Sequence, residues 1–502
     1  MFDLPEIPYL LTLLLVLPLL GAIVTLFMGG AKQKYAKYTS AAFSLVTLFF
    51  AVYLMLSNNW AAYTENYVWI DVAGLKMSYI LQVDGLSILM VFLTALLLPV
   101  VTLFSSNESD KPNYFFALLL AMEVGLMGVY MAGDFFLFYI MWEVTLIPMY
   151  FMISWFGGPR RHYAAIKFFI YTHVASLIML IGIFALVFQA GAGGVADFSF
   201  AAVKAGAAAF TGLFQTVVFG LMFFGFAVKM PIVPFHTWLP DAHTEAPTAG
   251  SVLLAAVMLK MGSYGIIRVC VEMLPAGAVQ WQGVMFVVAI VAILYGAYAC
   301  IAQKDLKKMV AFSSISHMGM VMLGIACLSE IGIMFAVFQM FAHGLVTAIL
   351  FMTCGMAGHN FGTREIPLLG GLAGKAPVFA AFMMFGFMAS LGLPGLVGFW
   401  GEFGIIFAFY EYSVSVNMIW LIVFCLMSLL LTAGYYLWAM QRSLFGRLTT
   451  KIDTSHLHDV SKAEGIAMGV MCFMIALFGL WPDLALDMIS QYSSALVTAG
   501  VI

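Results

Sequence analysis

The chain has 502 residues, of which 64% are hydrophobic and 9% are charged, and its formal net charge is -3. Soluble domains carry about 25% charged residues, so this composition excludes a soluble catalytic domain and predicts a polytopic membrane protein. It also gives no basis for nucleic-acid binding.

Apolar runs of about 20 residues predict fourteen membrane-spanning helices. We expect them near residues 8–29, 38–57, 79–104, 114–132, 134–156, 164–189, 213–239, 247–273, 281–302, 309–328, 331–357, 377–409, 417–441 and 464–481. The first run lacks a basic flank and a clear cleavage site, so we expect a span rather than a signal peptide. The chain ends shortly after the fourteenth run.

Basic residues divide unevenly between the connections. Connections after odd-numbered spans hold sixteen of the 21 lysines and arginines: Lys32, Lys34, Lys37, Lys111, Arg160, Arg161, Lys167, Lys304, Lys307, Lys308, Arg364, Lys375, Arg442, Arg447, Lys451 and Lys462. Connections after even-numbered spans hold only Lys76, Lys204 and Arg268. The positive-inside rule therefore predicts odd connections in the cytoplasm or matrix and both termini on the opposite, periplasmic side. We favour a bacterial inner membrane.

A weak internal repeat divides the chain. Phe168–Val174 in the sixth span resembles Phe338–Gly344 in the eleventh, and the proline-broken seventh span has a counterpart in the twelfth. Spans 4–8 and 9–13 would then form two inverted five-helix units with discontinuous helices in matching positions. We expect an N-terminal segment at 1–112, a first repeat at 113–275 as the proton input half, a second at 276–443 as the output half, and a C-terminal loop and helix at 444–502.

The stretch from Lys229 to Thr248 follows an apolar run yet carries four prolines, a lysine and two histidines. Proline interrupts a membrane helix only where protein or water satisfies the freed backbone groups. The stretch therefore predicts part of a polar cavity or ion path, and the next helix carries Lys260 near its middle.

Ionisable side chains recur within the predicted spans. Each costs roughly 2.5–3.5 kcal/mol at mid-membrane and needs a partner, water or a function. Glu143 in the fifth span and Lys229 at the break of the seventh are expected to form a gating ion pair, because a passing proton would weaken their attraction. Lys260 has no obvious carboxylate partner. The alternative is a structural pair that fixes helix register.

Glu402, in the broken twelfth span, mirrors Lys229 and is expected to end the polar path. His236, His317 and His343 are possible relays, because the histidine pKa lies closest to neutral; each is as easily a hydrogen-bonded packing group. The same holds for His173 in the sixth span.

Other charged residues favour plainer interpretations. Arg268, Asp241 and Glu245 are expected near water as surface charges, and Lys304–Lys308 as a cytoplasmic anchor. Asp84 is expected at the interface, and Glu123 could link the chain to a neighbour. The six cysteines stand singly, which favours packing and neither a metal site nor a disulfide framework.

Three motifs resemble those of the antiporter-like membrane subunits of respiratory complex I. They are Phe138–Glu143, Lys229–Pro247 and Lys304–His317, and the resemblance covers essentially the whole chain. Glutamate at 402 resembles the M-type (subunit 4) branch, since sibling subunits L and N typically carry lysine there. By position, Glu143 and Lys229 match the family's input pair, Lys260 its central lysine and Glu402 its output residue.

The resemblance implies proton translocation driven by quinone reduction elsewhere in an NADH:quinone oxidoreductase. The chain would hold no cofactor, while partner subunits, among them L-like and N-like chains, would carry flavin, iron–sulfur clusters and quinone. The alternatives are a subunit of a multisubunit cation/proton antiporter, a related membrane-bound hydrogenase or plastoquinone reductase, or a structural spacer that pumps nothing.

Overall fold

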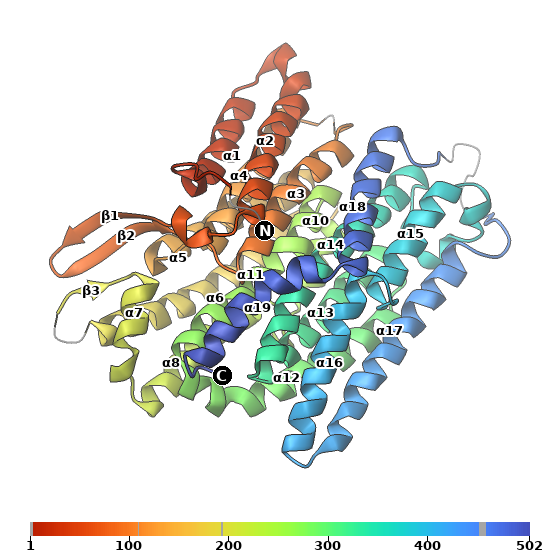
Figure 1. The fold of residues 1–502 in the computed structure, drawn as a ribbon. Helices are drawn as coiled ribbons and strands as arrows, with labels where there is room; N and C mark the ends of the chain where they lie inside the picture. Colours follow the sequence, from red (N-terminus) through yellow and green to blue (C-terminus); the bar gives the residue numbers. More distant parts are fainter. Residues whose placement is uncertain (1–3, 109, 192–193, 451–457) are drawn as a thin grey trace.

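The computed structural model describes residues 4–108, 110–191, 194–450 and 458–502, so Lys451 lies outside the described part. Long helices form a bundle with a small sheet at one edge (Figure 1). Eleven described helices are long and apolar enough to cross a membrane. The shorter helices α1 (Leu10–Leu26) and α3 (Ile88–Phe104), together with the broken twelfth span formed by α15 (Pro377–Ser390) and α16 (Val397–Ser415), bring the crossings to the expected fourteen.

The sheet joins two even connections. Strands β1 (Glu65–Val72) and β2 (Leu75–Leu81) form an antiparallel hairpin, and β3 (Ala196–Asp197) pairs with β2 in parallel. The third span was expected from residue 79, but residues 79–81 belong to β2 and the helix begins at Ile88. The apolar residues of the hairpin explain the error, because a short apolar run does not distinguish a strand from the start of a helix.

Helix α2 (Ala36–Leu56) precedes the first repeat. The repeat itself consists of α4 (Pro112–Met131), α5 (Phe135–Phe156), α6 (Arg161–Ala190), the short α7 (Phe200–Gly206), α8 (Gly212–Lys229), α9 (Trp238–Glu245) and one continuous helix. That continuous helix is made of α10 (Thr248–Leu253), η4 (Leu254–Met258), α11 (Leu259–Gly265) and η5 (Ile266–Val271). Asp134 caps α5 by accepting from the backbone N–H of Phe136 and Leu137, and Pro112 opens α4.

The seventh span is discontinuous, as predicted. Helix α8 ends at Lys229 and α9 starts at Trp238. The intervening Pro231 and Pro234 lack the N–H groups that an unbroken helix needs. The Trp238 indole N–H donates to the free carbonyl of Val228 (3.0 Å), so protein satisfies part of the opened backbone.

The second repeat contains a matching break. Its helices are α12 (Pro275–Ile301), α13 (Leu306–Ala326), α14 (Glu330–Asn360), α15 (Pro377–Ser390), α16 (Val397–Ser415) and α17 (Ile422–Ser443). Helix α15 ends before Gly392 and Gly395, which have φ of +78° and +91°. Only glycine adopts these values without strain, so the chain turns here and restarts as α16.

Two helices follow. Helix α18 (Lys462–Leu480) is the fourteenth span and opens with a capping box of Ser461 and Glu464. Helix α19 (Asp483–Thr498) was not predicted. It lies across the bundle (Figure 1), and the Tyr492 hydroxyl fastens it to Glu272 (2.9 Å).

Contacts between connections test the count of spans. Odd connections bind one another through Lys37 Nζ to Ser106 O (2.9 Å), Gly158 N to Glu245 O (2.8 Å), Leu306 N to Arg364 O (3.0 Å) and Gly371 N to Phe445 O (3.2 Å). Even connections do the same through Phe198 N to Lys76 O (2.9 Å) and Tyr492 OH to Glu272 (2.9 Å). We refer to these two sides as the basic face and the opposite face.

Arg268 is the clearest correction to the surface charges expected above. It is 3% exposed, because α19 and the start of α3 cover it. Its guanidinium binds both Asp84 oxygens (2.7 and 2.6 Å) and Glu272 (3.2 Å), and Tyr492 lies 5.1 Å from it. Arg268 therefore ties α3, η5 and α19 together.

Candidate functional site

Glu143 lies in the middle of α5 and binds two residues of α6. One carboxylate oxygen lies 2.8 Å from His173 Nδ1, and the other accepts from the Ser176 hydroxyl at 2.5 Å. The expected direct pair with Lys229 is not formed, since no hydrogen bond or ion pair joins them within the described residues. His173 and Ser176 are three residues apart and share one face of α6, so both reach the Glu143 carboxylate and occupy its two oxygens.

Lys229, at the last turn of α8, is 1% exposed and its ammonium has no hydrogen-bond partner among the described groups. It lies 5.6 Å from the ring centroids of both Trp142 and Phe168. Glu143 acts on it only through space. Aromatic faces therefore hold the cation where the expected partner was a carboxylate.

Lys260, on α11, is fully buried and begins a second set of polar side chains. Its amine donates to the backbone carbonyl of Ala255 (2.5 Å) and lies 2.7 Å from His343 Nδ1 on α14. Ala255 belongs to the π-helical turn η4, where the wider turn changes which carbonyls the side chain can reach. The side-chain partner of Lys260 is therefore a histidine and not a carboxylate.

The polar line continues from His343 to the broken twelfth span. His343 and His317 have ring centroids 5.4 Å apart, and His317 Nδ1 lies 3.0 Å from Glu402 Oε1. His317 Nε2 lies 3.2 Å from the hydroxyl of Ser390, which in turn lies 2.7 Å from Tyr436 OH. The structure therefore brings Lys260, His343, His317 and Glu402 together.

His236 lies apart from this line. It is 6% exposed and packs edge-on against Tyr295 at 4.8 Å, with no hydrogen bond on Nδ1 within the described residues. His243, which the sequence analysis did not select, is fully buried on α9 and stacks on Phe351 at 4.5 Å. Its electrostatic neighbours are Lys307 and Lys260. Its place beside His236 in the same proline-rich stretch was the available signal.

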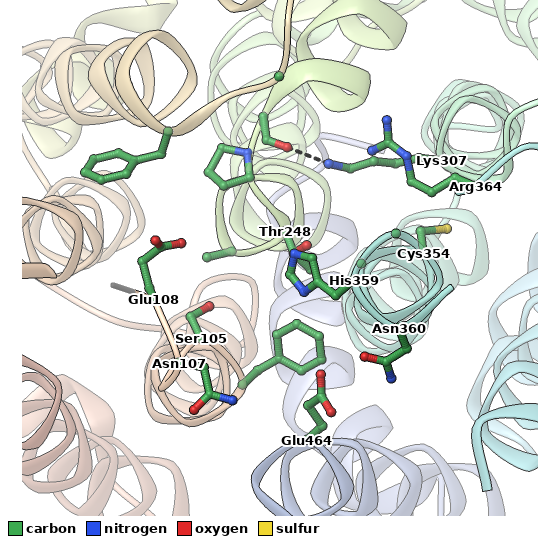
Figure 2. A pocket seen from close by; sticks show the side chains of 18 of the residues that line it. Ser105, Asn107, Glu108, Thr248, Lys307, Cys354, His359, Asn360, Arg364 and Glu464 are labelled. Carbon is green, nitrogen blue, oxygen red and sulfur yellow. Dashed lines mark hydrogen bonds between the residues drawn. The ribbon is translucent and has the colours of Figure 1, made fainter. Parts of the chain in front are cut away.

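A cavity of about 880 Å³ opens on the basic face at the end of α9 and the start of α10 (Figure 2). Lys307 lies in its wall, only 2% exposed, and its amine donates to the carbonyl of Ala246 (2.5 Å). Glu245, also in the wall and 7% exposed, accepts from the backbone N–H of Arg160 (2.8 Å). Lys307 and Glu245 are therefore not the exposed anchor and surface charge that we expected.

The arrangement supplies buried titratable groups that lie close to one another. No group of three or more histidine, cysteine or acidic residues that could hold a metal occurs in the described ranges. Lysine, histidine and carboxylate side chains within hydrogen-bond distance can exchange protons. Such a buried line in a membrane is typical of proton relays.

Comparisons with known proteins identify the family of the chain. Residues 132–432 match the family described as NADH:quinone oxidoreductase/Mrp antiporter, TM. F(420)H(2) dehydrogenase subunit M of Methanosarcina mazei is 42% identical over 97% of this chain and 98% of its own length. NADH-quinone oxidoreductase subunit M of Rhodobacter capsulatus is 37% identical over 97% of this chain and 96% of its own length.

Two solved structures share the fold. A chain of respiratory complex I from Thermus thermophilus is 28% identical, with a TM-score of 0.86 over 97% of this chain and 99% of that one. A chain of the Mrp complex from Dietzia sp. is 22% identical, with a TM-score of 0.84 over 98% of each, a likeness of fold alone. The chain belongs to the NADH:quinone oxidoreductase/Mrp antiporter transmembrane family, as an antiporter-like, M-type membrane subunit of the complex I kind.

Proposed function

We propose that the chain is a proton-translocating subunit of a quinone-reducing complex. Glu143 and Lys229 receive the proton, Lys260 holds it at the centre, His343 and His317 pass it on, and Glu402 releases it toward the opposite face. His236 is a possible further relay. The observation that carries the proposal is the buried line from Lys260 to Glu402, in which Lys260 contacts His343 and His317 contacts Glu402, with the two histidine rings 5.4 Å apart between centroids.

The first transfer in this line follows from its donors and acceptors. A protonated Lys260 amine donates toward His343 Nδ1 at 2.7 Å, so a proton can move to the ring while the other ring nitrogen releases one. His317 then passes a proton to Glu402 at 3.0 Å. The rings of His343 and His317 are 5.4 Å apart between centroids, so this step needs a bridging water or a ring movement.

The exposure of Glu143 and His173 is an argument for a partner subunit at this face. The Glu143 and His173 side chains are 23% and 37% exposed, and Ile147 and Ile170 beside them are 55% and 54% exposed. A carboxylate at mid-membrane depth does not face lipid. We infer that an L-like or N-like membrane chain covers this face and moves the Glu143 charge, while the redox cofactors lie in other partners.

The sequence of this chain does not distinguish between electron donors, because the donor would bind to partner subunits. The relatives named for F(420)H(2) and for NADH both match 97% of this chain. The 42% identity to the former makes an F(420)H(2)-linked complex the second candidate. Quinone reduction by the purified complex with each donor in turn separates the two. We place the chain in a cell membrane, with its ends on the periplasmic side.

The test is proton pumping by the assembled complex in sealed vesicles, measured with the quinone-reduction rate. Glu143→Gln should abolish pumping and reduction together, because the carboxylate is required in the coupled cycle. Glu411→Gln on the exposed surface of α16 makes the same chemical change as a control. Wild-type pumping by assembled Glu143→Gln would overturn the proposal in favour of a structural spacer. Sodium-dependent uptake without quinone reduction would favour the antiporter alternative.

A further inference from the structure

A second, smaller cavity of about 470 Å³ lies at the basic-face end of α17, on the outside of the bundle. Arg442, Arg447, Trp438, Gln441 and Phe445 line it together with the 366–370 segment. Backbone hydrogen bonds from Gly371 N to Phe445 O (3.2 Å) and from Thr449 N to Gly370 O (3.0 Å) hold the two segments together. The cavity is therefore built by structured backbone.

The charge of this cavity is one-sided. It is lined by two arginines and by no carboxylate. Within the described residues neither guanidinium forms an ion pair, and Arg442 stacks over the Trp438 ring at 4.5 Å. A guanidinium held on an aromatic ring keeps its outer N–H groups available in the fork that matches a phosphate.

The depth of the cavity corresponds to lipid headgroups. Helix α17 has 22 residues, which at 1.5 Å per residue is about 33 Å, close to the ~30 Å hydrocarbon layer. Arg442 is its penultimate residue, and Trp438 lies one turn before it. Tryptophan and arginine at the end of a span are typical of the membrane–water interface.

An apolar stripe runs from the cavity down the outer surface of α17. Val423, Leu426, Leu430 and Leu437 are 51%, 48%, 75% and 48% exposed. Their spacing places them on one helix face, which Gln441 and Phe445 continue into the cavity. Acyl chains can lie along this stripe while a headgroup occupies the cavity.

We propose that this cavity binds the phosphate of an anionic phospholipid whose acyl chains lie along α17. Basic pockets between spans on the positive side of a membrane protein are suited to such headgroups. The stripe and the depth together favour a lipid over a soluble anion. The proposal is independent of the proton path, because no residue of the path lines the cavity.

The test uses the assembled complex in nanodiscs with a phosphatidylglycerol probe that carries a photoreactive headgroup. Chymotryptic peptides of this chain are then mapped by mass spectrometry. We expect labelling within residues 438–447, displaced by unlabelled phosphatidylglycerol and not by phosphatidylcholine. Arg442→Gln combined with Arg447→Gln should lower it roughly tenfold or more, since each basic residue near an anionic headgroup contributes substantially.

A matched control removes the same charge from the same face. Lys34→Gln with Lys375→Gln changes two exposed lysines outside the cavity, and labelling should stay at the wild-type level. Equal labelling in both double variants would overturn the proposal. So would equal labelling by a phosphatidylcholine probe, or displacement by millimolar inorganic phosphate, which would indicate a soluble-anion site.

Discussion

The two broken spans place their charged residues in opposite surroundings. At the first break, the Lys229 amine lies near two aromatic rings and has no hydrogen-bond partner within the described residues, and Glu143 is held by His173 and Ser176 on a partly open face. At the second break, Glu402 is buried and bound to His317, which continues toward Lys260. The two interrupted helices therefore support one separated charge pair and one buried line of closely spaced groups.

This difference assigns different tasks to the two halves. The Glu143 side chain is 23% exposed, whereas that of Glu402 is 7% exposed. A group that a neighbouring chain can reach is suited to receiving a signal, because its charge changes with what covers it. A sealed line is suited to conducting protons without leakage. The following changes should break or sharpen that contrast.

The largest effect is expected from Lys260→Met, which removes the first group of the line that leads to Glu402. Methionine has similar length and no proton to give, so proton transport should fall roughly 10²-fold, the usual contribution of a positioned acid or base. Pumping in vesicles measures it, with exposed Lys304→Met as the matched control. Transport equal to the control in an assembled complex would show that protons bypass Lys260.

His173→Gln sharpens the description of the first half. Glutamine can still donate to Glu143 but cannot carry a proton onward, so we expect pumping to fall several-fold, less than for Lys260→Met. His162→Gln, near the basic-face end of α6, is the control. Pumping equal to that control would mean that His173 only positions Glu143 through its hydrogen bond.

Ser390→Ala tests how finely the second half is positioned. The hydroxyl lies between His317 and Tyr436, and losing one such bond costs about 1 kcal/mol, or about fivefold in rate if His317 is misaligned. The measurement is pumping across pH, with Ser428→Ala as the control. No change beyond that control would show that Glu402 alone orients His317.

The smallest effect is expected outside the membrane, at the Lys76–Asp197 pair between β2 and β3. Burial opposes ionisation, but bonds from Lys76 and Ser199 hold the pKa of Asp197 below its usual value. The stabilisation is present above the unfolded pKa of about 4 and is lost as pH falls through the lowered folded value. Lys76→Met should cost under about 1 kcal/mol.

Thermal unfolding of the complex at neutral and acid pH measures this cost. The difference between Lys76→Met and the wild type should shrink at acid pH, and pumping should be unaffected. A variant that alters pumping would show that the hairpin takes part in the contrast between the halves.

Much of the fold could be predicted from the sequence. Spans, breaks and the division of basic residues are local properties of composition, because the bilayer selects about 20 apolar residues per crossing whatever they pack against. The hairpin and α19 were not predicted from the sequence, because the hairpin contains a short apolar run and α19 is an amphipathic helix shorter than a span.

The sequence by itself determined which side chains carry charge within the membrane: Glu143, Lys229, Lys260 and Glu402. Only the tertiary structure decided their partners. Lys260 meets a histidine 83 residues away, Glu143 binds α6 and not Lys229, and Arg268 is buried because α19 folds back over it. Hydropathy depends on neighbours in sequence, whereas a hydrogen bond depends on how distant helices pack.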